Sequence, residues 1–378
     1  MKSRRLALAG LTIALCLGAW SVRSATVAEP AGALPARLDD RQFWNLVDGF
    51  SEPNGFFRSD NLVSNEDTFQ FVIPELKSIV KPGGVYLGVG PDQNFTYIVA
   101  LEPRIAFITD IRRGNLEEHL MYKALLELSP TRVEFLSRLF SRKAPEGLGP
   151  ASTAVELFDA FARVRGSQEL YDANLAAIKD LLLKRHRFPL GDEDVAGIGY
   201  IYGSFFAAGP YLSYSNSGFG GRGRYPSYQD LQVATDTAGL AHSYTASEAN
   251  YQALRALEQK NLIVPVVGNF AGPKALRAIG AWLRERQATV TAFYLSNVEQ
   301  YLFQDRIWIE FARNVGALPL DGTSTFIRSC FNNCASSYPS RSVSLIDSIP
   351  ELLKDFRDGR INTYWDVLSH SRNPAVIQ

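Results

Sequence analysis

Four short apolar runs in the sequence are each followed by glycine or polar residues that could bind a small molecule. In parallel α/β sheets, ligands bind beyond the carboxyl ends of the strands, where such residues converge. Glycine lets a ligand approach the backbone closely, and a carboxylate can accept hydrogen bonds or neutralise a cation. We therefore expect one ligand site built from several strand ends. The candidate residues are Gly88, Gly90, Asp92, Asp110, Asn269 and Glu299.

The glycines after the first run and the acids near them suit an adenosine-like ligand with a cationic arm. Asp110 lies at the spacing where a carboxylate takes ribose hydroxyls. A dinucleotide fingerprint would have a third glycine where Gln93 stands, and Asp92 would repel a pyrophosphate, so NAD and FAD are disfavoured. We assign Asp92 to the cationic amino-acid arm and place Asn269 and Glu299 at the reacting end.

Other chemistries find little support, and no catalytic residue is assigned. The four histidines form neither an HExxH nor a close His-x-His pattern, so no metal site is predicted. His242 follows Asp236 and is the general-base candidate among them, although a hydrogen-bonded structural histidine fits the same position. A hydrolase would need the Gly-x-Ser-x-Gly elbow, and Ser204 lacks its closing glycine.

The elements that must position these residues alternate between strands and helices. Residues 85–89 and 105–109 are predicted strands, and residues 95–101 form a short helix between them, which makes a βαβ unit. Residues 263–267 and 289–295 are two further apolar runs, separated by a helical pattern. This alternation predicts an α/β fold with a mainly parallel sheet.

The mature chain is expected to form one three-layer, Rossmann-like α/β domain over residues 39–378. A mostly helical insertion, over about residues 115–188, interrupts the sheet because leucines recur every four residues there. Residues 213–228 contain several glycines and no aliphatic side chain. We interpret them as a loop that is either a lid over the cleft or a plain connector.

The N-terminal residues resemble an export signal. Basic residues precede an uncharged apolar stretch from Leu6 to Trp20, which is shorter than the roughly 20 residues that a spanning helix needs. We expect residues 1–28 to be a signal peptide or a retained membrane anchor, followed by an Ala/Pro-rich linker at residues 29–38. The protein is therefore expected in the periplasm or outside the cell, touching a membrane only through an uncleaved segment.

Two of the three cysteines, Cys330 and Cys334, remain after removal of such a signal. In an oxidising compartment this pair could form a disulfide that closes a tight loop. Two unpaired thiols are the alternative. A zinc site is disfavoured, because no second cysteine pair or nearby histidine completes a tetrahedral shell.

The composition limits the classes of function. The 378 residues include 39 Lys and Arg and 39 Asp and Glu, so the formal net charge is zero. Without a cationic excess we expect no binding to nucleic acid. The hydrophobic share of 46% and charged share of 21% are those of a globular protein and exclude a disordered chain or a polytopic membrane protein. The expected partner is a small-molecule ligand.

Two sequence segments resemble the class I S-adenosylmethionine-dependent methyltransferases. VYLGVGPDQ is similar to their glycine motif and ITDIRR to their acidic ribose-binding tip. The resemblance covers residues 81–110 and, more loosely, residues 263–301. It implies a Rossmann-like fold, S-adenosylmethionine as cofactor and methyl transfer as the reaction. The chain departs from the pattern where Tyr86 or Leu87 replaces the usual acid and where no Asn-Pro-Pro-Tyr-type tetrapeptide follows the later strand.

Two hypotheses follow from these observations. The first is a protein that binds S-adenosylmethionine or a related nucleoside and, if it is an enzyme, transfers a methyl group. The second is an exported, non-enzymatic binding module on a diverged methyltransferase-like fold, which the missing motifs favour. The segments YLGVGPDQNFTYI, DIRR and FYLSNVEQYL also resemble those of an uncharacterised group of bacterial proteins, a likeness that implies no activity.

Overall fold

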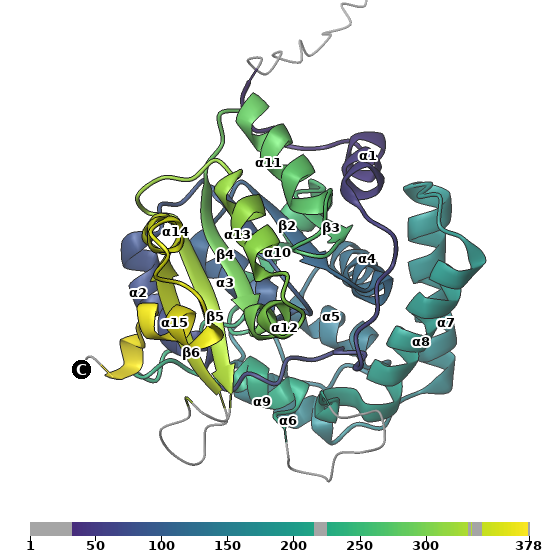
Figure 1. Cartoon of the computed structure of the whole chain (residues 1–378). Coiled ribbons are helices and arrows are strands. Elements are labelled where there is room, and N and C mark those ends of the chain that lie inside the picture. Colours follow the sequence, from purple (N-terminus) through teal and green to yellow (C-terminus); the bar gives the residue numbers. More distant parts are fainter. Residues whose placement is uncertain (1–31, 215–224, 332–333, 335–341, 377–378) are drawn as a thin grey trace, which may run out of the picture. The chain divides into compact units, whose positions relative to one another are not determined.

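One six-stranded sheet, with strand order β3-β2-β1-β4-β5-β6, forms the centre of the protein (Figure 1). A computed structural model of the chain describes residues 32–214, 225–331, 334 and 342–376. The first five strands are parallel to their neighbours, and β6 is antiparallel to β5. This confirms the predicted α/β fold with a mainly parallel sheet. The strands are β1 (Val85–Gly88), β2 (Ile105–Asp110), β3 (Ile263–Val267), β4 (Val290–Ser296), β5 (Thr325–Phe331) and β6 (Ser342–Ser348).

The strands on the β3 side of the sheet form because their sequences are almost wholly apolar. Every residue of β1, β2 and β3 is buried, as expected of parallel strands with helices on both faces. Pro265 lies within β3 and cannot donate a hydrogen bond to a neighbouring strand. It is tolerated because β3 is an edge strand of the sheet.

Helices cover both faces of the sheet (Figure 1). The helix α11 (Ala275–Glu285) shows why: Leu276, Ile279 and Leu283 recur at helical spacing on one face and are all buried. One face carries α1 (Asp40–Phe50), α11 (Ala275–Glu285), α13 (Trp308–Gly316) and α14 (Ile349–Arg357), and the other carries α2 (Ile73–Ile79), α3 (Gln93–Leu101), α4 (Arg113–Leu128) and α10 (Glu248–Gln259). Two further helices, α12 (Val298–Gln304) and α15 (Tyr364–His370), contact each other.

The helical insertion between β2 and β3 is longer than predicted. We expected it to end near residue 188, but α8 (Asp192–Ala208) and α9 (Tyr228–Val233) extend it, and α8 packs on α4. Three glycines within α8 weaken its helical pattern. The insertion contains α5 (Arg132–Leu139), α6 (Ala154–Ala162), α7 (Gln168–Asp180), α8 (Asp192–Ala208) and α9 (Tyr228–Val233). Short 3-10 or π turns are η1 (Phe69–Val72), η2 (Leu181–Arg185), η3 (Gly209–Tyr211) and η4 (Pro374–Val376).

The N-terminal part of the described chain is packed. Leu34 and Leu38 belong to the predicted linker, yet both are buried in the main hydrophobic core. Their apolar side chains outweigh the Ala/Pro character of the surrounding segment. Residues from Gly32 onward form a single compact unit, while the predicted export segment, residues 1–28, lies outside the described residues. Within the described residues, no helix is long and apolar enough to cross a membrane.

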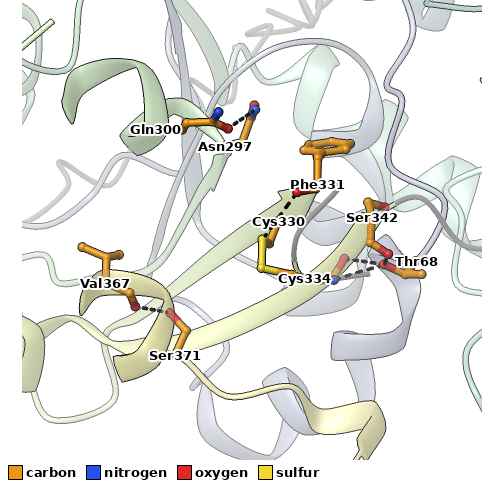
Figure 2. Close-up of a disulfide and its surroundings, with 10 residues drawn as sticks. Thr68, Asn297, Gln300, Cys330, Phe331, Cys334, Ser342, Val367 and Ser371 are labelled. Atoms are coloured by element: carbon orange, nitrogen blue, oxygen red, sulfur yellow. Dashed lines mark hydrogen bonds between the residues drawn. A yellow bond between two sulfur atoms is a disulfide. The ribbon is translucent and has the colours of Figure 1, made fainter. Parts of the chain in front are cut away.

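Cys330 and Cys334 form a disulfide at the carboxyl end of β5, with their Cα atoms 5.6 Å apart (Figure 2). The structure therefore favours the first of the two alternatives left open by the sequence. Cys330 is buried and packs with Leu345 and Leu368. Beside the disulfide, the Thr68 hydroxyl donates a hydrogen bond of 3.1 Å to the carbonyl of Ser342, which joins the start of β6 to the segment before α2.

Candidate functional site

A cleft opens at the carboxyl ends of four neighbouring strands. Gly90 after β1, Asp110 at the end of β2, Asn269 after β3 and Asn297 after β4 all line it. Because β1 lies between β2 and β4 and the chain runs outward on both sides, this edge is the topological switch point of the sheet. The cavity volume is about 200 Å³, well over ten times the roughly 15 Å³ that one ordered water needs. The cleft can therefore hold a small organic molecule.

The segment between α1 and η1 crosses the strand ends and forms one wall of this cleft. The Glu52 N–H donates to the carbonyl of Val267 at the end of β3 (2.7 Å), and the Gly55 N–H donates to the carbonyl of Ile111 after β2 (2.8 Å). Phe56 follows, lines the cleft and is 85% exposed. An aromatic ring that is left in solvent at the edge of a cleft offers a surface on which a planar ligand group could stack.

The lining combines aromatic rings with acidic groups. Phe57 packs edge-on against Tyr301 of α12, with ring centroids 5.4 Å apart. Acidic side chains outnumber the one basic side chain among the described lining residues, so the formal charge of the cleft is negative. The charged lining residues are Glu66, Asp110, Arg112 and Asp305.

The turn after β1 presents Gly90 to the cleft. Gly90 has a φ of 76°, a left-handed conformation that favours glycine. Its carbonyl accepts hydrogen bonds from His119 Nε2 (2.9 Å) and Asn94 Nδ2 (3.2 Å). The same Asn94 amide donates to the carbonyls of Val89 (2.8 Å) and Pro91 (2.7 Å). Two buried side chains therefore fix the shape of this turn.

Asp110 lies at the tip of β2, where the sequence placed it, but it already has a partner. Its Oδ1 accepts from the backbone N–H (2.9 Å) and Nε (3.2 Å) of Arg112, and its Oδ2 accepts from Arg112 Nη2 (3.3 Å). A carboxylate offers about four acceptor positions. Asp110 can therefore bind two ribose hydroxyls only if Arg112 releases at least one of these contacts, and the 3.3 Å contact is the longest.

Two candidates near the first turn do not line the cleft. Gly88 instead makes room for Asn94, because a Cβ at Gly88 would overlap the Asn94 side-chain oxygen. Asp92 is buried and accepts hydrogen bonds from Gln232 Nε2 and the Tyr244 hydroxyl, both at 2.9 Å. Burial raises the pKa of Asp92 to about 7, although the Tyr244 hydrogen bond partly opposes this. Its side chain contacts α9 of the helical insertion and the loop before α10, and it is not among the residues that line the cleft.

Glu299 also lies outside the cleft lining. It is buried at the start of α12, where Trp308 Nε1 donates to its Oε1 (2.9 Å) and the Arg328 guanidinium donates to both of its oxygens. Arg328 also bonds Asp347 of β6 through Nη1 (2.7 Å). Glu299 is thus one acid in a buried ion-pair network that joins α12, β5 and β6.

None of the four histidines lines the described part of the cleft. His242, the general-base candidate, lies on the loop before α10 and its Nε2 is 2.7 Å from Asp236 Oδ2. Burial lowers the pKa of His119 to about 4, so this ring is neutral at physiological pH. No group of three His, Cys, Asp or Glu side chains in the described ranges is arranged to hold a metal ion.

Sequence reasoning missed the most buried acid of the cleft, Glu66. Glu66 lies in the loop before η1 and lines the cleft. Its carboxylate accepts hydrogen bonds from Tyr294 of β4 (2.8 Å), Ser296 and Gln93 of α3 (2.8 Å). Glu66 shares the cleft with the glycine turn after β1 but precedes that turn by more than 20 residues in the sequence. The residues around it therefore give no local signal that it belongs to the site.

These features define an α/β protein with a cleft at the topological switch point of its sheet. The chain belongs to the family described as "Domain of unknown function (DUF7790)", whose sequence profile matches residues 61–182 and 223–358, more than half of the chain. The matched ranges include Glu66, Gly90, Asp110 and Asn269 of the cleft. No curated protein matches the chain in a sequence search.

Proposed function

We propose that the protein binds S-adenosylmethionine or a closely related nucleoside in this cleft, on a Rossmann-like fold that resembles the class I methyltransferases. The observation that carries the proposal is that Gly90 and Asp110, from adjacent strands, line one cleft at the switch point. The order β3-β2-β1-β4-β5 is that of doubly wound nucleotide-binding sheets. If the protein catalyses a reaction, methyl transfer is the one that this ligand supports.

The charge of the cleft favours this ligand over a dinucleotide. A pyrophosphate is bound by backbone N–H groups and by free cations. Among the described lining residues the cation is Arg112, and it is already engaged with Asp110. The acids Glu66 and Asp305 remain, and they suit a ligand that carries positive charge.

Replacing Asp110 by alanine should weaken nucleoside binding about ten- to a hundredfold. A hydrogen bond to a charged group contributes roughly 1.5–3 kcal/mol, and about 1.4 kcal/mol corresponds to tenfold in affinity. The variant also leaves Arg112 without its carboxylate partner beside a cationic ligand, which acts in the same direction. Asp110→Asn should lose less affinity, because its amide oxygen can still accept one hydroxyl.

Calorimetric titration with S-adenosylmethionine and S-adenosylhomocysteine measures both variants. Glu146→Ala is a matched control. It removes the same charge from an exposed residue of the helical insertion, far from Asp110 in the sequence. If folded Asp110→Ala binds the ligand with unchanged affinity, the ligand site does not include the tip of β2. No heat from the folded wild type would eliminate both ligands.

The second candidate function is that of a non-enzymatic binding module, which binds its ligand in the same cleft but catalyses no reaction. It is favoured by the lack of any histidine among the described lining residues and by the sequence Ser296-Asn297-Val298 where methyltransferases of the Asn-Pro-Pro-Tyr type have their catalytic tetrapeptide. A chain that binds S-adenosylmethionine but yields no S-adenosylhomocysteine with any acceptor tested would belong to this class.

We also propose that the protein is exported. The Cys330–Cys334 disulfide supports this, because such bonds persist mainly in oxidising compartments. Cell fractionation should find the chain outside the cytosol, shortened if residues 1–28 are cleaved. Full-length protein confined to the cytosol, with both cysteines reduced, would contradict the proposal.

A further inference from the structure

Glu66 is a buried carboxylate that faces a cleft. Its exposed fraction is 1%, yet it lines the cavity together with Tyr294 and Ser296. Charged side chains are rarely buried to this extent unless an opposite charge or a metal accompanies them. The buried position of Glu66 therefore raises the question of which positively charged group accompanies it.

The described partners of Glu66 are all neutral. Tyr294 and Ser296 donate hydroxyls to Oε1, and Gln93 donates its amide to Oε2. Within the described residues, no Lys, Arg or His forms an ion pair with it. Three neutral donors therefore converge on a carboxylate at the cleft, and no described cation accompanies it.

Other acids at this edge of the sheet differ from Glu66 in this respect. Asp110 is paired with Arg112, and Glu299 is paired with Arg328. Asp92 has no cationic partner among the described residues, but it does not line the cleft, and burial raises its pKa to about 7. Glu66 alone among these four acids combines a hydrogen-bonded carboxylate, no cation of its own and direct access to the cavity.

We propose that Glu66 is the counter-ion for a positively charged group of the ligand, an organic ammonium or sulfonium. The inference rests on the cleft being the ligand site of the proposed function, and it assigns to Glu66 the role that the sequence gave to Asp92. The aromatic rings of Phe57 and Tyr301, which line the same cleft, provide further surfaces that attract such cations.

Glu66→Gln tests this role because it removes the charge and keeps the shape. Gln93 Oε1 has no hydrogen-bond partner in the described part of the chain, so a rotated Gln93 amide can accept a hydrogen bond from the new glutamine. The variant should therefore fold, which its thermal unfolding midpoint checks. Glu146→Gln is the matched control, since it makes the same substitution at an exposed residue that is not among the residues lining the cleft.

The expected result is selective for ligand charge. S-Adenosylmethionine should bind Glu66→Gln about ten- to a hundredfold more weakly than wild type, as for a lost bond to a charged group. Adenosine, which is uncharged, should bind the two proteins within about twofold. Glu146→Gln should change either affinity by less than about fivefold, because an exposed charge outside the cleft interacts weakly with the ligand.

Trimethylsulfonium, a cation without a nucleoside, separates this inference from the proposed function. If adenosine binds but S-adenosylmethionine binds Glu66→Gln as tightly as wild type, the role of Glu66 is refuted and the nucleoside site stands. If no nucleoside binds the wild type but trimethylsulfonium does, and the variant loses it, the nucleoside proposal fails and the role of Glu66 is supported. If neither kind of probe binds the wild type, both are overturned.

Discussion

Replacing Arg328 by alanine is expected to lower the free energy of unfolding by about 3–5 kcal/mol, the usual cost of removing one partner from a buried ion pair. Arg328 is 1% exposed and bridges Glu299 of α12 and Asp347 of β6. Its guanidinium also lies over the ring of Phe326, 4.5 Å from the centroid. Burial lowers the pKa of Arg328, but Glu299 and Asp347 more than offset this, so it stays charged. The variant would leave Glu299 in the core without a counter-charge, and Asp347 with only the His370 imidazole, whose Nδ1 lies 2.7 Å from Asp347 Oδ1.

Urea denaturation at neutral pH measures this loss. Arg313→Ala is the control, because Arg313 pairs with Glu310 at the surface, and exposed pairs contribute only about 0–1 kcal/mol. Adding Glu299→Gln to the Arg328 variant should recover part of the stability, since it removes one of the stranded charges. A loss below about 1 kcal/mol for Arg328→Ala would show that the network does not hold α12 and β6 together.

Gly88→Ala should cost at least about 2 kcal/mol of unfolding free energy, although Gly88 does not have a left-handed backbone. The added Cβ would overlap the side-chain oxygen of Asn94 and crowd the Tyr86 ring. Overpacking typically costs about 1–3 kcal/mol. A displaced Asn94 would also lose its hydrogen bonds to the carbonyls of the turn and to the Tyr86 hydroxyl, and an unsatisfied buried group costs roughly 1–3 kcal/mol.

Gly90→Ala is the informative comparison. There the nearest atom to a new Cβ is Asn61 Nδ2 at 3.4 Å, so the cost arises from the left-handed φ of 76°. That cost is about 1–2 kcal/mol, less than the value expected at Gly88. If urea denaturation ranks the two variants in the opposite order, Asn94 does not hold the turn in the way described.

The strands that build the cleft could be predicted because their signals are local. Each is a short apolar run that ends in a polar tip, and residues 263–267 coincide with β3. In contrast, β5 and β6 escaped prediction. They carry Arg328 and Asp347 at buried positions, so charges that neutralise each other only in the folded state interrupt their apolar pattern.

The location of the candidate site could be predicted from the sequence, but only some of the residues that line it could. Gly90, Asp110 and Asn269 line the cleft. Asp92 does not, because it lies one residue before α3 and spacing alone does not say which way its side chain turns. Glu66 could not be predicted, since its contacts to Tyr294 and Ser296 span more than 220 residues of sequence.

A crystal structure of the protein grown with S-adenosylhomocysteine tests the central claim most directly. The account predicts the ligand in the cleft at the ends of β1, β2 and β4, with its ribose hydroxyls within hydrogen-bond distance of Asp110. Its amino group should point toward Glu66, and the Arg112 guanidinium should have moved off the Asp110 side chain. A cleft that stays empty at saturating ligand, or a ligand bound elsewhere on the chain, would contradict the account.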